Sequence, residues 1–149
     1  MNIFLDTEFN GFGGDLISLA LVADDGREFY EVLPCMEPTP WVKKHVIPAL
    51  GREPLGPEIF SARLSMAWKL GKFFKGFTED LIIVADWPED LAHFFAATTN
   101  RHGLSVVLCD LTARLLVNMP PIALTSTVPH NALADAHALK LCYYEAYLK

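Results

Sequence analysis

Apolar runs separated by turn residues divide the first part of the chain into segments typical of β-strands. Residues 3–6 form a short apolar run that ends in an acid, and the glycine-rich stretch 10–14 follows it as a loop. The apolar runs 16–23 and 28–33 flank Asp24-Asp25-Gly26-Arg27, which is a strong hairpin signal. We therefore predict that the first three strands form an antiparallel meander.

Six prolines interrupt residues 34–57 and leave room for only one short helix in this stretch. We expect that helix near residues 41–47, with Thr39 as its N-cap and Pro40 at its first position. The remainder of the stretch is predicted to be irregular connection.

Helical and strand patterns alternate after residue 58. Apolar residues at spacings of four and three predict a helix over about 60–74, with the buried stripe Phe60, Leu64, Ala67, Gly71 and Phe74. Continuous apolar runs at 81–85 and 104–108 indicate strands covered on both faces, and a helix that opens at Pro88 separates them.

The last helix is predicted from about Ala132 to Leu148, with Asn131 as its N-cap. The order β-β-β-α-β-α-β-α implies an α/β fold. Its mixed five-stranded sheet would join the three-strand antiparallel meander to two parallel strands, flanked by helices. We expect a single domain over residues 1–149, because 52% apolar residues at this length suit one core.

Composition favours the cytoplasm and argues against a membrane partner. The N-terminus lacks a basic leader, and no run approaches the roughly 18 apolar residues that span a bilayer. The three cysteines, Cys35, Cys109 and Cys142, are far apart, which fits neither a disulfide framework nor a zinc site.

The acidic balance at first argues against a nucleic-acid partner. The chain has 12 basic and 18 acidic residues, a formal charge of −6, whereas phosphate binding is mainly electrostatic. The objection weakens if Asp6, Glu8, Asp86 and Asp135 surround two divalent cations, because the cations balance four negative charges and face the phosphate themselves.

Three of these acids follow predicted strands. Side chains two apart on a strand point the same way about 6.6 Å apart, so Asp6 and Glu8 can both reach cations that lie about 3.5–4 Å from each other. Asp86 ends the run 81–85, at the sheet edge where ligands gather. The alternatives are that Asp6 and Glu8 only cap a strand end and that Asp86 only stabilises the following helix start.

His130 and Asp135 form the last candidate pair. Five steps along an α-helix would turn the two side chains about 140° apart, so His130 must lie in the loop if both serve one site. Asp135 then projects from the first helical turn on an apolar stripe, where a cation would compensate its charge. The alternative is an acid that simply stabilises the helix start.

Taken in this order, the Asp-x-Glu, the Asp after a middle strand and the His-x4-Asp resemble the motifs of the DEDDh exonucleases, a superfamily with a ribonuclease H-like fold. The chain looks most similar to small bacterial 3′–5′ exoribonucleases of this group. The resemblance implies that Asp6, Glu8 and Asp135 bind two Mg²⁺ or Mn²⁺ ions, with Asp6 bridging. It also implies that Asp86 holds the second ion and that His130 is the general base.

The resemblance leaves one rival ligand and several uncertain substrate contacts. Asp110, followed by Leu111 and Thr112, is similar to a family Asp-Thr pair; we interpret it as structural and as the main rival to Asp86. Phe9, Asn10 and Phe12 replace the usual small polar residues and are candidate substrate contacts. Lys69 and Lys72 are candidate phosphate contacts, though all five have structural interpretations as well.

The implied activity is removal of nucleoside 5′-monophosphates from a single-stranded 3′ end, with RNA preferred over DNA. A proofreading-type 3′–5′ DNA exonuclease and an inactive nucleic-acid-binding module are the alternatives. A homodimer through Tyr143, Tyr144 and Tyr147 of the last helix is left open.

Overall fold

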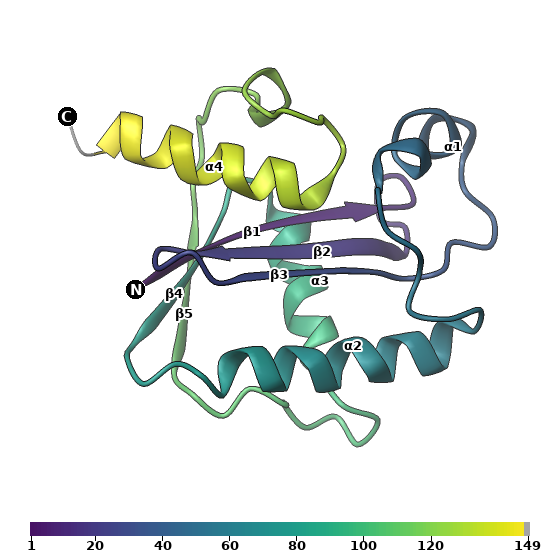
Figure 1. The fold of residues 1–149 in the computed structure, drawn as a ribbon, viewed down its shortest axis with the longest axis horizontal. Helices are drawn as coiled ribbons and strands as arrows, with labels where there is room; N and C mark the ends of the chain where they lie inside the picture. Colours follow the sequence, from purple (N-terminus) through teal and green to yellow (C-terminus); the bar gives the residue numbers. More distant parts are fainter. Residues whose placement is uncertain (148–149) are drawn as a thin grey trace.

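One mixed sheet organises the chain, and the computed structural model describes residues 1–147. Its five strands lie in the order β3-β2-β1-β4-β5 (Figure 1). They are β1 (Asn2–Phe9), β2 (Leu16–Ala23), β3 (Glu28–Val32), β4 (Leu81–Ala85) and β5 (Leu111–Leu115). The first three are antiparallel, and β4 and β5 run parallel to β1. The predicted α/β architecture is therefore confirmed and is consistent with a ribonuclease H-like fold.

Helices flank both faces of the sheet (Figure 1). They are α1 (Pro40–His45), α2 (Ile59–Phe74), α3 (Pro88–Ala97) and α4 (Ala132–Tyr147), with short 3₁₀ helices η1 (Ile47–Ala49) and η2 (Ile122–Leu124). Helix α4 packs on β1 and β2 from one side, whereas α2 and α3 share the core on the other. The predicted end of the last helix at Leu148 lies outside the described residues. Within residues 1–147, no helix has the length and apolar character of a membrane span.

Alternation along β1 decides which side chains reach which helices. Ile3 and Leu5 belong to the core beneath α2 and α3, whereas Phe4 packs against Tyr143 of α4 with ring centroids 5.3 Å apart. Because side chains two apart share a face, Asp6 and Glu8 continue the row of Phe4 on the α4 side. The sheet thus delivers both acids to one end of the same face.

The start of α1 follows the sequence prediction. Thr39 accepts a hydrogen bond from the Val42 backbone nitrogen at 3.3 Å, and Pro40 occupies the first turn. The helix ends at His45, slightly earlier than predicted.

Helix α2 spans the predicted residues but turns a different stripe toward the core. Its buried residues are Ala62, Met66, Ala67, Leu70 and Phe74. Phe60, which we predicted to be buried, is 65% exposed. The predicted stripe was wrong in part because this helix is apolar on more than one side.

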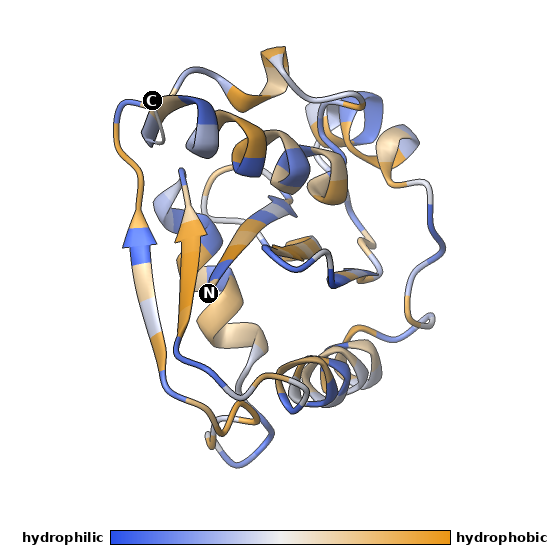
Figure 2. Ribbon diagram, turned by 60° about the vertical axis from the view of Figure 1, so that its left-hand side comes forward, coloured by the Kyte–Doolittle hydropathy of each residue, from blue (hydrophilic) through white to orange (hydrophobic). Residues whose placement is uncertain are grey.

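The fifth strand lies later in the chain than predicted. Residues 104–108 are not a strand; β5 begins at Leu111, opposite Leu81 of β4. Within the apolar stretch before it, Val106 packs against α2, since a Cβ built on Gly71 would lie 3.1 Å from the carbonyl oxygen of Val106. Leu104 and Leu108 of the same stretch are exposed. Figure 2 shows why the pattern misled, because β4 is almost wholly hydrophobic whereas the edge strand β5 mixes polar and apolar residues.

Candidate active site

A cleft of about 500 Å³ opens at the carboxyl end of β1. Segments that are far apart in the sequence line it: the end of β1, the residues after β4, the first turn of α3, and the loop before α4 with the first turn of that helix. All five predicted site residues meet there, namely Asp6, Glu8, Asp86, His130 and Asp135. A further carboxylate, Asp90, joins them.

The side chains form two groups, each with oxygen or nitrogen atoms close enough to hold one metal ion. The first group is Asp6, Asp86 and Asp90, and the second is Glu8, His130 and Asp135. Within each group the potential ligand atoms lie within 4.8 Å of one another. Carboxylate oxygens are the ligands that Mg²⁺ and Mn²⁺ favour.

Asp90 is fixed by the strand between the two predicted acids. Its Oδ1 accepts hydrogen bonds from the backbone nitrogen of Thr7 at 3.2 Å and from the Thr7 hydroxyl at 2.6 Å. Only 2% of Asp90 is exposed. The Thr7 side chain, which points to the opposite face from Asp6 and Glu8, thereby aligns the first turn of α3 with the end of β1.

The loop before α4 presents His130 in an unusual backbone conformation. Its φ of 67° lies in the left-handed region, which few non-glycine residues adopt. Its backbone nitrogen donates to Asp135 Oδ2 at 3.0 Å, which fixes the loop onto the helix. Asn131 caps α4 by accepting from the Ala134 backbone nitrogen at 3.0 Å, as predicted. His130 therefore lies outside the helix and beside Asp135.

Three of the carboxylates have buried oxygens that make no hydrogen bond within the described chain. These atoms are Oδ2 of Asp6, Oδ2 of Asp90 and Oδ1 of Asp135. A buried charged oxygen without a partner is costly, and divalent cations would satisfy all three atoms. The donor set therefore fits metal ions better than it fits an unliganded acidic cluster.

The pKa values of the cleft carboxylates also favour a site that holds metal ions. Burial, and then the nearby carboxylates of Asp90 and Glu8, raise the pKa of Asp6 well above its ordinary value. Burial and the Asp135 carboxylate raise the pKa of Glu8 to about 8, and burial raises the pKa of Asp90 to about 7. The ionised cluster thus needs positive charge to be stable at neutral pH.

The candidate substrate contacts divide between the cleft and other surfaces. Phe9 and Phe12 line the cleft, and the Phe9 ring packs against His93 at 5.1 Å. The Asn10 side chain bonds the backbone of neighbouring segments rather than lining the cleft. Lys69 donates to Glu31 at 2.6 Å, and the Lys72 ammonium lies 4.1 Å from the Trp68 ring centroid.

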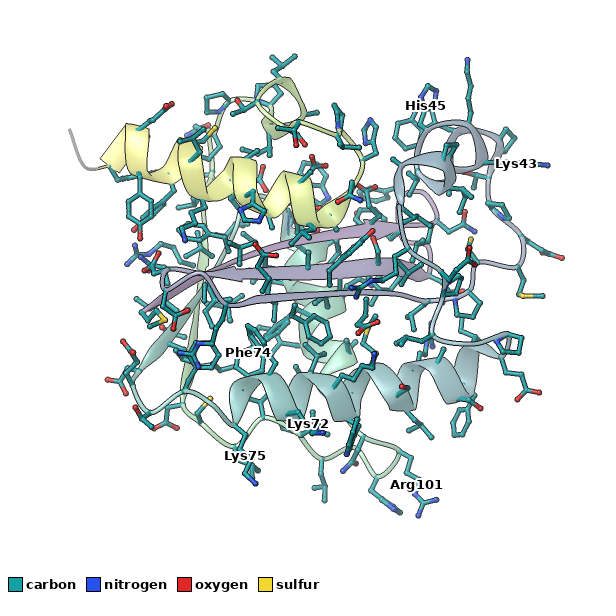
Figure 3. The ribbon with its side chains drawn as sticks, in the orientation of Figure 1. Lys43, His45, Lys72, Phe74, Lys75 and Arg101 are labelled. Atoms are coloured by element: carbon teal, nitrogen blue, oxygen red, sulfur yellow. The ribbon has the colours of Figure 1, made fainter. Side chains whose placement is uncertain are left out.

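Lys69 and Lys72 belong to α2, on the other side of the sheet from α4. Figure 3 shows Lys72 there, beside Lys75 at the end of the helix. Lys69 and Lys72 remain predicted phosphate contacts only for a substrate that extends around the sheet edge.

The structure separates Asp110 from the cleft. It precedes β5, whose first residue pairs with Leu81 at the start of β4, so it lies about one strand length from Asp86. Sequence reasoning missed Asp90 because acids in a first helical turn are common. The available signal was its spacing of four from Asp86, which brings both acids to the same strand-to-helix junction.

The fold and the site together define a class. A ribonuclease H-like sheet with ordered acids at the end of its first strand, after its middle strand and at the start of its last helix agrees with the DEDDh exonuclease superfamily.

Comparison with known proteins identifies the family within that class. No family model matches the chain. Two curated relatives, the 3′–5′ exoribonucleases MT2234.1 and Rv2179c of two Mycobacterium tuberculosis strains, are each 32% identical to it over 134 residues. Each match covers 87% of this chain and 68% of the relative. The chain belongs to the family of these bacterial 3′–5′ exoribonucleases.

Proposed function

We propose that this protein is a 3′–5′ exoribonuclease that removes nucleoside 5′-monophosphates from single-stranded RNA, using two divalent cations. The observation that carries the proposal is the convergence of five carboxylates and one imidazole in a single cleft. The family relationship supports the substrate class, because both relatives are named for this activity.

The two groups of side chains suggest the cation positions. Asp6, Asp86 and Asp90 would hold one Mg²⁺ or Mn²⁺ ion, and Glu8 with Asp135 would hold the other. Asp90 is the addition to the predicted ligands, since it is more buried than Asp86 and has an unpartnered oxygen. Cations held there would lower the pKa of a water molecule and would stabilise negative charge on the phosphate and on the leaving oxygen.

His130 is assigned as the general base. Within the described chain its imidazole is engaged by no hydrogen bond, so a ring nitrogen is free to accept a proton. The attacking water would give its proton to this nitrogen. The water oxygen would then bond to phosphorus while the bond from phosphorus to the 3′ oxygen breaks. The leaving 3′ oxygen then takes up a proton. The products are a nucleoside 5′-monophosphate and a strand shorter by one residue.

Digestion of 5′-labelled single-stranded RNA and DNA of one sequence, with Mg²⁺ or Mn²⁺, tests the proposal. We expect a ladder shortened from the 3′ end one residue at a time, faster for RNA, and none with EDTA. Internal fragments or removal from the 5′ end would contradict the exonuclease assignment. Equal rates on RNA and DNA would remove the RNA preference, and binding without cleavage would favour an inactive module.

A further inference from the structure

A second opening lies between α2 and α3, on the face of the sheet opposite α4. It encloses about 390 Å³ and is lined by the start of β2, the first half of α2, the end of α3 and the loop that follows α3. We call it the α2–α3 groove. Its lining includes the buried apolar residues Leu33 and Met66 and the exposed Arg63 and Arg101. An apolar hollow with a few charged groups is typical of a ligand site.

The groove adjoins the candidate active site through two elements. The β1–β2 loop lines the cleft with residues 11–12 and the groove with residues 14–15. Helix α3 lines the cleft with Glu89 and the groove with His93, about one turn later. The ring of Phe9, in the cleft, lies 5.1 Å from the ring of His93. The two openings therefore share a wall.

The charged side chains of the two openings differ in sign. Within residues 1–147, no lysine or arginine lines the cleft, and six carboxylates do, namely Asp6, Glu8, Asp86, Glu89, Asp90 and Asp135. The groove is lined by two arginines and one carboxylate, Asp15. Phosphate binding is mainly electrostatic, so phosphates that lie away from the metal ions find no cationic side chain in the cleft. The groove provides such side chains next to it.

Arg63 is held by a contact that a phosphate can replace. Its guanidinium donates to Asp15 Oδ1 at 2.7 Å, and the two side chains are 52% and 72% exposed. Ion pairs as exposed as this one contribute little net stability. Arginine can bind a phosphate through two parallel hydrogen bonds. The contact with Asp15 thus positions Arg63 at the groove without withholding it from a phosphate.

The loop that carries Arg101 is constrained by its own hydrogen bonds. Asn100 Oδ1 accepts from the backbone nitrogens of His102 at 2.9 Å and Leu104 at 3.1 Å. These bonds fix the backbone on the C-terminal side of α3 in a tight turn. A constrained backbone lowers the entropic cost of bringing Arg101 against a ligand.

Helix α2 extends the positive surface beyond the groove. It contains Arg63, Lys69 and Lys72 and no acid. Figure 3 shows Lys72, Lys75 and Arg101 along the same side of the molecule. The chain as a whole has a net charge of −6, so a helix whose charged residues are all basic is a local exception. Such a surface is typical of proteins that bind a polyanion.

We propose that the α2–α3 groove is a second RNA-binding site, in which Arg63 and Arg101 bind phosphates of the strand upstream of its 3′ end. This inference rests on the proposed function and extends the substrate from the residues in the cleft to a longer single strand. The enzyme should therefore favour strands long enough to reach the groove over strands that fill only the cleft.

Single-stranded RNA oligonucleotides of increasing length provide the test. Wild-type KM should fall as the strand becomes long enough to reach the groove and should then stay constant, while kcat changes little. Arg63→Gln and Arg101→Gln should each raise the KM of long strands about 10-fold, since hydrogen bonds between charged groups contribute at least that much. The shortest strand that wild type cleaves should be cleaved equally well by both variants, which shows that the cleft is intact.

Salt dependence and a matched variant separate phosphate binding from a general loss of charge. For a long strand, each arginine variant should reduce the slope of log affinity against log salt concentration by about 0.7, the contribution of one single-strand phosphate contact. Lys43→Gln removes one positive charge from α1 and should leave the length dependence unchanged, because Lys43 lines neither opening. Figure 3 shows Lys43 far from Arg101.

A wild-type KM that is the same at every length would overturn the groove proposal and leave the proposed function intact. The same conclusion would follow if both arginine variants kept the full length dependence. Cleavage of no strand at any length would contradict the proposed function instead. The groove would then be judged from binding of a long strand, where equal affinities of wild type and the arginine variants overturn it and weaker binding by the variants supports it.

Discussion

The carboxylate of Asp90 accepts two hydrogen bonds from Thr7, one from the backbone nitrogen and one from the hydroxyl. Thr7 lies between Asp6 and Glu8 on β1, so this contact sets the position of the α3 carboxylate relative to both strand acids. Helix α3 and strand β1 are separated by about 80 residues of chain, and this pair is a direct polar connection between them at the cleft.

The first prediction concerns Thr7 itself. Thr7→Val keeps the shape of the side chain but removes the hydroxyl that orients Asp90. We expect Mn²⁺ affinity, measured by calorimetry, to fall about 10- to 100-fold, because groups that orient metal ligands have effects of this size. Thr7→Ser retains the hydroxyl and should bind Mn²⁺ nearly as tightly as wild type. Unchanged affinity in Thr7→Val would mean that Asp90 needs no such orientation.

The second prediction ranks the two acids at the β4–α3 junction. Asp90→Asn should lower kcat by more than about 100-fold, because it removes the most buried negative charge of its group. Asp86→Asn should have a smaller effect, because Asp86 is less buried. Asp110→Asn is the matched control and should stay within about two-fold of wild type, since Asp110 lies at the far end of the parallel strands. The reverse order of Asp86 and Asp90 would restore Asp86 as the principal ligand.

The third prediction follows from the raised pKa values and concerns metal-free protein. The pKa of Glu8 rises from 4.5 to about 8, and that of Asp90 rises from 3.8 to about 7. The folded state therefore favours the protonated form of both acids. Their contribution to the free energy of unfolding is fully present at low pH. It is lost as the pH rises through the window from about 4 to about 8.

Thermal unfolding in EDTA checks this dependence. Tm should fall between pH 5 and pH 8, and Mn²⁺ should raise Tm more at pH 8 than at pH 5, because the cations stabilise the ionised carboxylates. Glu8→Gln should flatten the decline. A metal-free Tm that rises across this range would show that the carboxylates are not destabilised by burial.

The fourth prediction tests the general base. His130→Asn is the suitable change, because asparagine tolerates the left-handed backbone at this position. We expect kcat to fall about 10²- to 10⁴-fold while KM and Mn²⁺ affinity change little. A variant with near-normal kcat would remove His130 from the proton transfer.

Much of the fold was predictable because its signals are local. The turn residues around Gly26 fixed the hairpin, Thr39 and Pro40 fixed the start of α1, and Asn131 fixed the start of α4. The fifth strand was mispredicted because β5 is a largely exposed edge strand without a buried pattern, while Val106 in the apolar run before it packs on α2.

The site was predictable only where an acid follows a recognisable element. Asp6, Glu8, Asp86 and Asp135 each occupy such a place, and the structure brings them together. Asp90 was missed because acids in a first helical turn are common. Its spacing of four from Asp86 was the available signal, whereas its hydrogen bond to Thr7 on a distant strand follows from no pattern along the chain.

The central claim is that carboxylates from β1, the β4–α3 junction and α4 hold a pair of cations in one cleft. Anomalous difference density from crystals soaked in Mn²⁺ tests it most directly. We expect two peaks in the cleft, one among Asp6, Asp86 and Asp90 and the other beside Glu8 and Asp135. Well-ordered crystals with no Mn²⁺ peak between these side chains would contradict the account.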